Sequence, residues 1–254
     1  MAKANPLSKA AAAFRELKQL RRVTNDLDDF TLARFERAAR ESIEVDPIVS
    51  RQLMGVVAAL RWDREMVDLE FSKALGVGGG HMVIANWARA SRDLNDFERA
   101  SDLLEDAVAI SPENLMYLSE AIGNNFMAGR WDKASRFFEL WEQRSKKKDA
   151  FVERAETVVK FAKAIGLRSE TVRNVGRVVC EFLTEKKIRL VGVRDVIQEV
   201  LGEECIFFEY YIHGSYERAQ ELDEELTPRL FDNVGDLQLG IFGCSIEVYP
   251  DATD

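Results

Sequence analysis

Apolar residues along most of this chain recur at the spacing of a helix with one buried face. Between Phe97 and Ala109 the apolar positions are 97, 100, 103, 104, 107 and 108, which form one stripe on a helix. The segment from Met82 to Leu94 has a similar stripe, and Asp96 can cap the helix that follows it. The pattern therefore predicts two helices joined by a short turn.

This predicted helix pair recurs 34 residues further along the chain. Sliding one segment over the other aligns the residues that would set the contact between two helices. The aligned pairs are Asn95 and Gly129, Phe97 and Trp131, Ala100 and Ala134, and Ala107 and Trp141. The best copies are residues 81–114 and 115–148, and the second copy departs from the first where Trp141 replaces an alanine.

These residues resemble the tetratricopeptide repeat (TPR), a helix pair with a period of 34 residues and with small and aromatic residues where its helices meet. In the first copy Trp87 and Ala88 match the large and small pair of the first helix, and Pro112 matches the closing proline, which we expect to open the next helix. Weaker copies precede it, with one helix expected from Ile48 to Leu60, so the resemblance covers roughly residues 30–148. A generic helical bundle with an accidental period is the alternative.

The C-terminal segment has a different pattern. "CIFFEYY" (205–211) and "LQLGIFGCSIEVY" (237–249) are typical of strands. "GVRDVIQEVLGE" (192–203) and "SYERAQELDEELTPRLF" (215–231) are expected to be helices, the second capped by Ser215. The predicted fold is therefore mainly α: a TPR-like array of antiparallel helix pairs (1–188) followed by a small α+β module (189–254).

The distribution of charge supports this boundary. The chain carries 35 basic and 44 acidic residues, a net charge of −9. From Leu190 onward there are three basic and 15 acidic residues, so the last segment has a net charge of −12 and the rest of the chain +3. An acidic module attracts a basic partner and repels nucleic acid, so an inhibitor or neutralising protein acting through this module is one possible function.

The chemistry available to an enzyme is sparse. Only two histidines occur, no G-x-S-x-G motif is present, and "GVGGGH" lacks the lysine and hydroxyl of a phosphate-binding loop. The three cysteines do not have zinc-ligand spacing and form an odd set. No apolar run reaches 18 residues, and the N-terminal segment does not resemble a secretory signal. We expect a cytoplasmic protein that is not an enzyme and needs no cofactor or metal.

The resemblance to TPR proteins implies a concave groove, lined by the first helix of each pair, that binds a segment of another protein. The expected groove residues are Met82, Ala85, Asn86, Arg89, Met116, Ser119, Gly123 and Asn124. The leading functional hypothesis is therefore a protein–protein interaction scaffold that does not bind membranes; a homo-oligomer is possible.

One local pattern suggests DNA binding instead. "FAKAIGLRSETVRNVGRVV" (161–179) resembles a helix-turn-helix, with Gly166 in the turn and Val172 and Val175 facing inward. The exposed, base-reading residues would be Ser169, Thr171, Arg173, Asn174 and Arg177. Two helices joined by a glycine turn give the same spacing in a repeat protein. A DNA-binding transcriptional regulator is therefore an alternative, and nucleic acid is the less expected partner.

Overall fold

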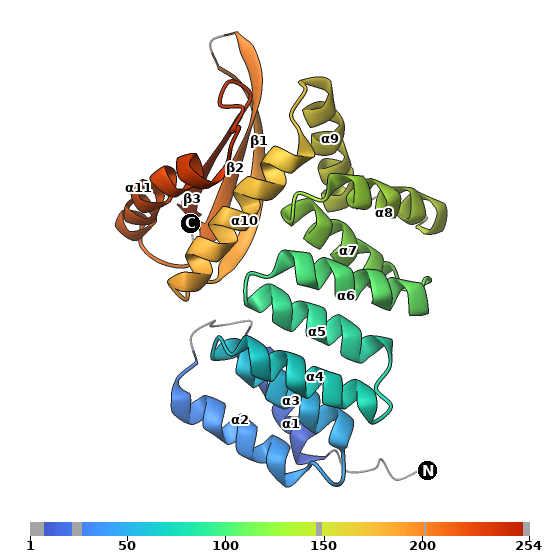
Figure 1. The fold of residues 1–254 in the computed structure, drawn as a ribbon. Coiled ribbons are helices and arrows are strands. Elements are labelled where there is room, and N and C mark those ends of the chain that lie inside the picture. Colours follow the sequence, from blue (N-terminus) through green and yellow to red (C-terminus); the bar gives the residue numbers. More distant parts are fainter. Residues whose placement is uncertain (1–7, 22–26, 146–148, 201, 251–254) are drawn as a thin grey trace. The chain divides into compact units, whose positions relative to one another are not determined.

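The computed structural model describes residues 8–21, 27–145, 149–200 and 202–250. These residues are mainly helical and end in a small three-stranded sheet, which confirms a mainly α fold with a small α+β module (Figure 1). The helices before the sheet are α1 Lys9–Leu20, α2 Asp29–Glu41, α3 Pro47–Leu60, α4 Arg64–Gly76, α5 His81–Asp93, α6 Phe97–Ile110, α7 Leu115–Met127, α8 Trp131–Arg144, α9 Ala150–Ala164 and α10 Ser169–Glu185.

The chain forms two compact units, and the division between them runs through α6. The N-terminal unit contains residues up to Leu94 together with 102–111, and the C-terminal unit contains 95–101 together with everything from Pro112 onward. The boundary near residue 188 stays a prediction from charge. In the structure, α9 and α10 lie before this boundary and share one hydrophobic core with the sheet that follows it.

Helix starts recur at nearly constant intervals. The odd-numbered helices α1 to α9 begin at residues 9, 47, 81, 115 and 150, which are 38, 34, 34 and 35 residues apart. The even-numbered helices α2 to α10 begin at 29, 64, 97, 131 and 169, which are 35, 33, 34 and 38 apart. This regularity is that of a helical repeat with a period close to 34 residues.

The turn inside each pair also repeats. A residue in the left-handed conformation follows the first helix in four of the pairs: Trp62 (φ 63°), Asn95 (φ 59°), Gly129 (φ 65°) and Gly166 (φ 75°). After Trp62, Gly129 and Gly166, the backbone N–H of the next residue bonds a carbonyl five positions back, for instance Arg130 N to Asn125 O at 2.8 Å. This is a Schellman-type helix end, so the sequence repeat corresponds to a repeated backbone geometry.

Small and aromatic residues occupy the expected buried positions. Ala100 and Ala107 are fully buried, and so is Ala134, one period after Ala100. Trp87 stacks on Phe71 with 6.0 Å between ring centroids. The aromatic and alanine positions that carry the repeat pattern are therefore core positions.

One detail of the repeat prediction is wrong. Pro112 does not open the next helix: α7 begins at Leu115, and the Asn114 side chain accepts a hydrogen bond from Met116 N at 3.1 Å. Asparagine is a strong N-cap because its side chain satisfies an otherwise unpaired backbone donor. Pro112 lies instead in the turn that precedes this cap.

The sheet contains β1 Leu190–Val200, β2 Glu203–Ile212 and β3 Phe242–Val248, in the order β1-β2-β3. β1 pairs with β2 antiparallel and β2 with β3 parallel. Helix α11 Tyr216–Asn233 connects β2 to β3, and Ser215 caps it as expected.

The prediction of a helix over 192–203 is wrong, because most of this segment is β1. β-branched Val191, Val193, Val196 and Ile197 favour an extended chain, and Gly202 takes a positive φ of 86° beside the start of β2. Pairing with β2 over ten residue pairs fixes the strand. The module therefore runs strand, strand, helix, strand, and β3 is shorter than the predicted 237–249.

One face of the sheet belongs to the core of the C-terminal unit. Along β2 the side chains at 206, 208, 210 and 212 are buried, while those at 207, 209 and 211 are partly exposed. Phe208 lies at the centre of an aromatic cluster, with its ring centroid 5.8 Å from Phe126, 6.4 Å from Trp131 and Tyr210, and 5.5 Å from Phe242. Helices α7 to α11 contribute to the same core.

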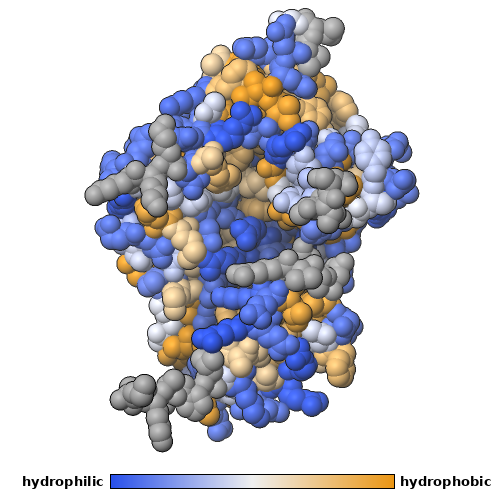
Figure 2. Space-filling view, turned by 180° about the vertical axis from the view of Figure 1, so that it is seen from behind, coloured by the Kyte–Doolittle hydropathy of each residue, from blue (hydrophilic) through white to orange (hydrophobic). Residues whose placement is uncertain are grey.

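The surface is largely hydrophilic on the side shown in Figure 2, where hydrophobic residues form separate areas between blue ones. Among the described residues, no helix combines the length and apolarity that crossing a membrane would require.

Candidate functional site

Three first helices of the N-terminal unit carry polar side chains at 34-residue intervals: Lys18 on α1, Gln52 on α3 and Asn86 on α5. Asn86 Nδ2 donates to Gln52 Oε1 at 2.7 Å, and Arg89 Nη1 donates to Asn86 Oδ1 at 2.8 Å. Gln52 is buried, and its Nε2 makes a long bond of 3.4 Å to Ile48 O. We call Lys18, Gln52, Asn86 and Arg89 the polar row.

The polar row is positively charged. Partial burial and, to a smaller extent, the nearby charge of Arg89 lower the pKa of Lys18. Lys18 Nζ also lies 4.6 Å from the centroid of the Phe14 ring, a cation–π distance. Two cationic side chains on α1 and α5 thus influence each other beside two amide side chains, and an anionic or strongly polar group would be attracted to this position.

The expected groove residues of the N-terminal unit differ in accessibility. Met82 is 65 % exposed, and Asn86 and Arg89 are partly exposed. Ala85 is fully buried and cannot contact a guest, because its position on α5 faces the unit's interior. Three of these four residues therefore remain reachable.

The expected groove residues of the C-terminal unit are less open. Met116 is 53 % exposed and Ser119 is partly exposed. A side chain at Gly123 would lie 3.3 Å from Cζ of Phe151, so that ring sits against the glycine. Asn124 is 4 % exposed and donates to Glu120 O at 2.7 Å. Packing of Phe151 from α9 on α7 leaves Gly123 only partly exposed.

The turn and the start of the second helix of the helix-turn-helix-like segment contact a loop of the same unit. Thr171, expected to be exposed, is 3 % exposed, and its Oγ1 lies 3.2 Å from Asp236 O and 3.1 Å from Gln238 Oε1. Arg168 also pairs with Asp236, and its backbone N–H donates to Gln238 at 3.0 Å. The sequence could not indicate this loop contact, since its partners are more than 60 residues away.

The remaining cationic candidates of this segment face carboxylates. Arg173 Nε lies 2.6 Å from Glu98 Oε1, and Arg177 Nη1 lies 3.1 Å from Glu181 Oε1. The backbone at Arg173 also packs on the Gly129 turn. Ser169 and Asn174 are partly exposed. A DNA phosphate or base would have to compete with these acidic partners.

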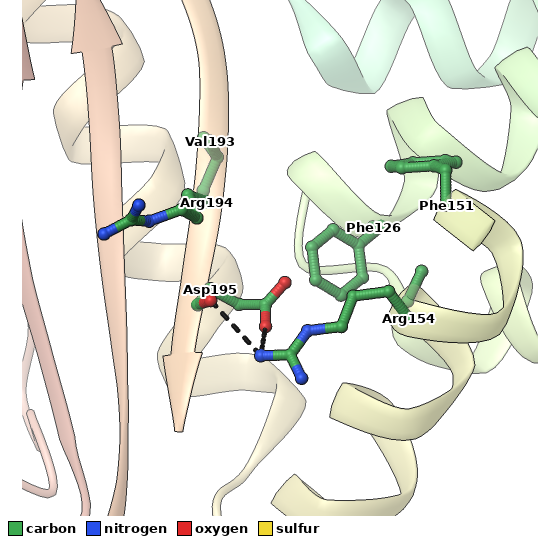
Figure 3. A pocket seen from close by; sticks show the side chains of 7 residues that line it. Phe126, Phe151, Arg154, Val193, Arg194 and Asp195 are labelled. Carbon is green, nitrogen blue, oxygen red and sulfur yellow. Dashed lines mark hydrogen bonds and ion pairs between the residues drawn. The ribbon is translucent and has the colours of Figure 1, made fainter. Parts of the chain in front are cut away.

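A pocket of about 380 Å³ lies in the C-terminal unit (Figure 3). Its lining residues come from α7, α9 and β1 and are Phe126, Phe151, Arg154, Ala155, Val193, Arg194 and Asp195. Arg154 Nη2 forms an ion pair with the Asp195 carboxylate and lies 3.3 Å from the Asp195 carbonyl oxygen. Sequence reasoning missed this pocket because one wall is β1, which was expected to be a helix.

Two of the described cysteine thiols are held in their protonated form. Cys180, Cys205 and Cys244 are all unpaired thiols. Burial raises the pKa of both Cys180 and Cys244 to about 12, so their reactive thiolate form is scarce at neutral pH. Within the described residues, no group of three or more His, Cys, Asp or Glu side chains is arranged to hold a metal ion.

Comparison with known proteins does not assign this chain to a family. No family model matches it, and neither the curated proteins nor the solved structures give a match.

Proposed function

We propose that this protein is a TPR-like, non-enzymatic scaffold, and that the polar row of its N-terminal unit binds a segment of a partner protein. The observation that carries this proposal is the 34-residue spacing of Lys18, Gln52 and Asn86 on successive first helices. In TPR proteins, to which the sequence is similar, the first helices line the binding surface. The three unpaired cysteines are consistent with the reducing environment of the cytoplasm.

The chemistry of the row indicates which partner segment it suits. Lys18 and Arg89 supply positive charge, and the partly exposed Asn86 amide can donate to or accept from a peptide backbone. Buried Gln52 holds that amide in place by accepting from Asn86 Nδ2. Exposed Met82 on the same helix as Asn86 offers a flexible apolar contact. The favoured partner is thus an acidic segment that also carries an apolar side chain.

Selection of peptides from a random displayed library on the purified full-length chain tests the proposal. The affinity of a selected peptide is then measured by fluorescence anisotropy for the unaltered chain and for Asn86→Ala and Arg89→Ala. Loss of a hydrogen bond to a charged group costs about 1.5–3 kcal/mol, so we expect Arg89→Ala to weaken binding roughly ten-fold or more. Arg37→Ala, on an exposed position of the second helix α2, is the control and should bind normally.

If peptides bind equally well to both row variants and to the control, the polar row is not the binding surface and the proposal fails. The DNA-binding alternative predicts retarded DNA migration at low salt, where phosphate contacts are strongest. The buried Thr171 and the paired Arg173 favour the scaffold over that alternative. An acidic inhibitor acting through residues 189–254 would instead bind basic proteins and lose affinity steeply with salt.

A further inference from the structure

We infer that the pocket between α7, α9 and β1 binds a small organic acid, in which a carboxylate is attached to an aromatic or branched aliphatic group. This site lies in the C-terminal unit and does not depend on the polar row. Its volume of about 380 Å³ is within the range of small-molecule sites, which are mostly apolar with a few polar groups. The inference depends on its walls and on one arginine.

Apolar side chains form most of the wall. Phe126 comes from α7, Phe151 and Ala155 from α9, and Val193 from β1. Phe151 is 48 % exposed at the rim, and its ring is held against Gly123 of α7. Ala155 is small and buried, so it leaves space where a larger residue would fill the pocket. These walls suit an aromatic or branched aliphatic group.

Both arginines that line the pocket are paired with a carboxylate, but Arg154 keeps N–H donors to spare. Arg194 points away from the pocket in Figure 3, toward the next strand, and its Nε pairs with Glu209 at 2.8 Å. Arg154 contacts Asp195 through Nη2 alone. Its Nε and Nη1 have no partner among the residues that the structure describes, although a guanidinium presents five N–H donors.

Arg154 can therefore bind a ligand carboxylate while Asp195 holds it in place. Its side chain is 47 % exposed, whereas that of Asp195 is 10 % exposed. An incoming acid reaches the arginine first. Bidentate contact between a guanidinium and a carboxylate gives both affinity and orientation.

The same geometry disfavours an extended peptide at this place. β1 is an edge strand, and edge strands can accept an additional strand. Arg154 already occupies the Asp195 carbonyl oxygen, which an added strand would need as an acceptor. A compact acid uses Arg154 without displacing it.

The experiment compares N-acetyl-phenylalanine with N-acetyl-phenylalaninamide, which differ in charge and little in shape. Each is titrated into the full-length chain while the methyl resonances of Ala155 and Val193 are followed by NMR. We expect saturable binding of the acid, at least ten-fold tighter than the amide. Arg154→Gln should abolish this preference, and Asp195→Asn should tighten acid binding several-fold because the competing carboxylate is gone. Arg218→Gln, an exposed position on α11, should change neither affinity.

Several results would overturn the inference: no saturable binding, equal affinity for the acid and the amide, or spectral shifts that avoid both methyl groups. A ten-residue peptide ending in phenylalanine that binds ten-fold tighter than the free acid would show that a protein terminus, and not a small acid, is the occupant. Thermal unfolding checks that Arg154→Gln and Asp195→Asn are folded. If a variant does not fold, the relative affinities of the unaltered chain for the acid and the amide still decide whether the pocket binds a carboxylate.

Discussion

Replacement of Asn95 tests how, within the C-terminal unit, the turn before α6 is held to the start of β1. Asn95 is 3 % exposed and has a left-handed φ of 59°. Its Nδ2 donates to Ile188 O at 2.9 Å and to Thr184 Oγ1 at 3.3 Å, and its Oδ1 accepts from Leu190 N at 2.9 Å. One side chain in the turn before α6 thus satisfies backbone groups at the start of β1.

The expected loss of stability follows from these contacts. In Asn95→Ala, the N–H of buried Leu190 loses its partner, which costs about 1–3 kcal/mol, and the loss of the bond to Ile188 O costs about 1 kcal/mol more. Alanine in the left-handed region adds about 1–2 kcal/mol. The sum is about 3–6 kcal/mol. Asn95→Gly avoids the backbone penalty, so it should be less destabilising than Asn95→Ala.

Urea unfolding of the full-length chain measures these differences, and hydrogen exchange of the Leu190 amide locates them. We expect stability to fall in the order unaltered chain, Asn95→Gly, Asn95→Ala, with faster Leu190 exchange in both variants. The control is Asn233→Ala, where an exposed asparagine bonds only to Arg229 O within its own helix. The reasoning is refuted if Asn95→Ala is as stable as the control, or if glycine is worse than alanine.

Further expected outcomes concern the turns, the thiols and the sheet. Gly129→Ala should destabilise the chain by about 2–4 kcal/mol in urea unfolding, because its Cβ would lie 2.5 Å from Arg173 N and its φ is 65°; unchanged stability would contradict the close packing of α10. Cys180 and Cys244, each partly buried and with a pKa of about 12, should react slowly with a thiol reagent in the native chain at neutral pH and quickly in urea; fast native reaction would contradict the raised pKa. Burial and a carboxylate neighbour raise the pKa of Tyr211 to about 12 from the ordinary 10.0. The unfolded chain therefore loses this proton first, so stability should fall between pH values of about 10 and 12, and Tyr211→Phe should reduce that fall when unfolding is compared across this range.

The helix pairs could be predicted from the sequence because their signal is local. Asp96 does cap α6, accepting from Arg99 N at 3.0 Å, and the aromatic position at 97 recurs as Trp131 one period later. β1 could not be predicted, since the spacing of its apolar positions fits either a helix or a strand and only β2, further along the chain, decides between them. Periodicity describes one element, whereas strand pairing requires a second.

For the candidate site, too, the sequence pattern of one helix could not predict the contacts with its neighbours. Asn86 and Arg89 were predicted as groove residues from their helix positions and are partly exposed, but Ala85 beside them is buried. The pattern on one helix does not specify the exact angle at which neighbouring helices cover it. The pocket could not be predicted from the sequence either. It brings together Phe126, Arg154 and Asp195 from two helices and a strand, and no spacing pattern in the sequence connects these three residues.

The turns of the array show how a repeated backbone can carry different side chains. Trp62, Asn95, Gly129 and Gly166 all have positive φ, a conformation that is costly for every residue except glycine. At Gly129 the neighbouring backbone of Arg173 leaves no space for a side chain, so glycine is required. At Asn95 three hydrogen bonds offset the cost that glycine would avoid. At these two turns the residue is therefore determined by its neighbours, whereas at Gly166 a side chain would have open space. The backbone geometry of the turns can thus repeat although the residues at the turns differ.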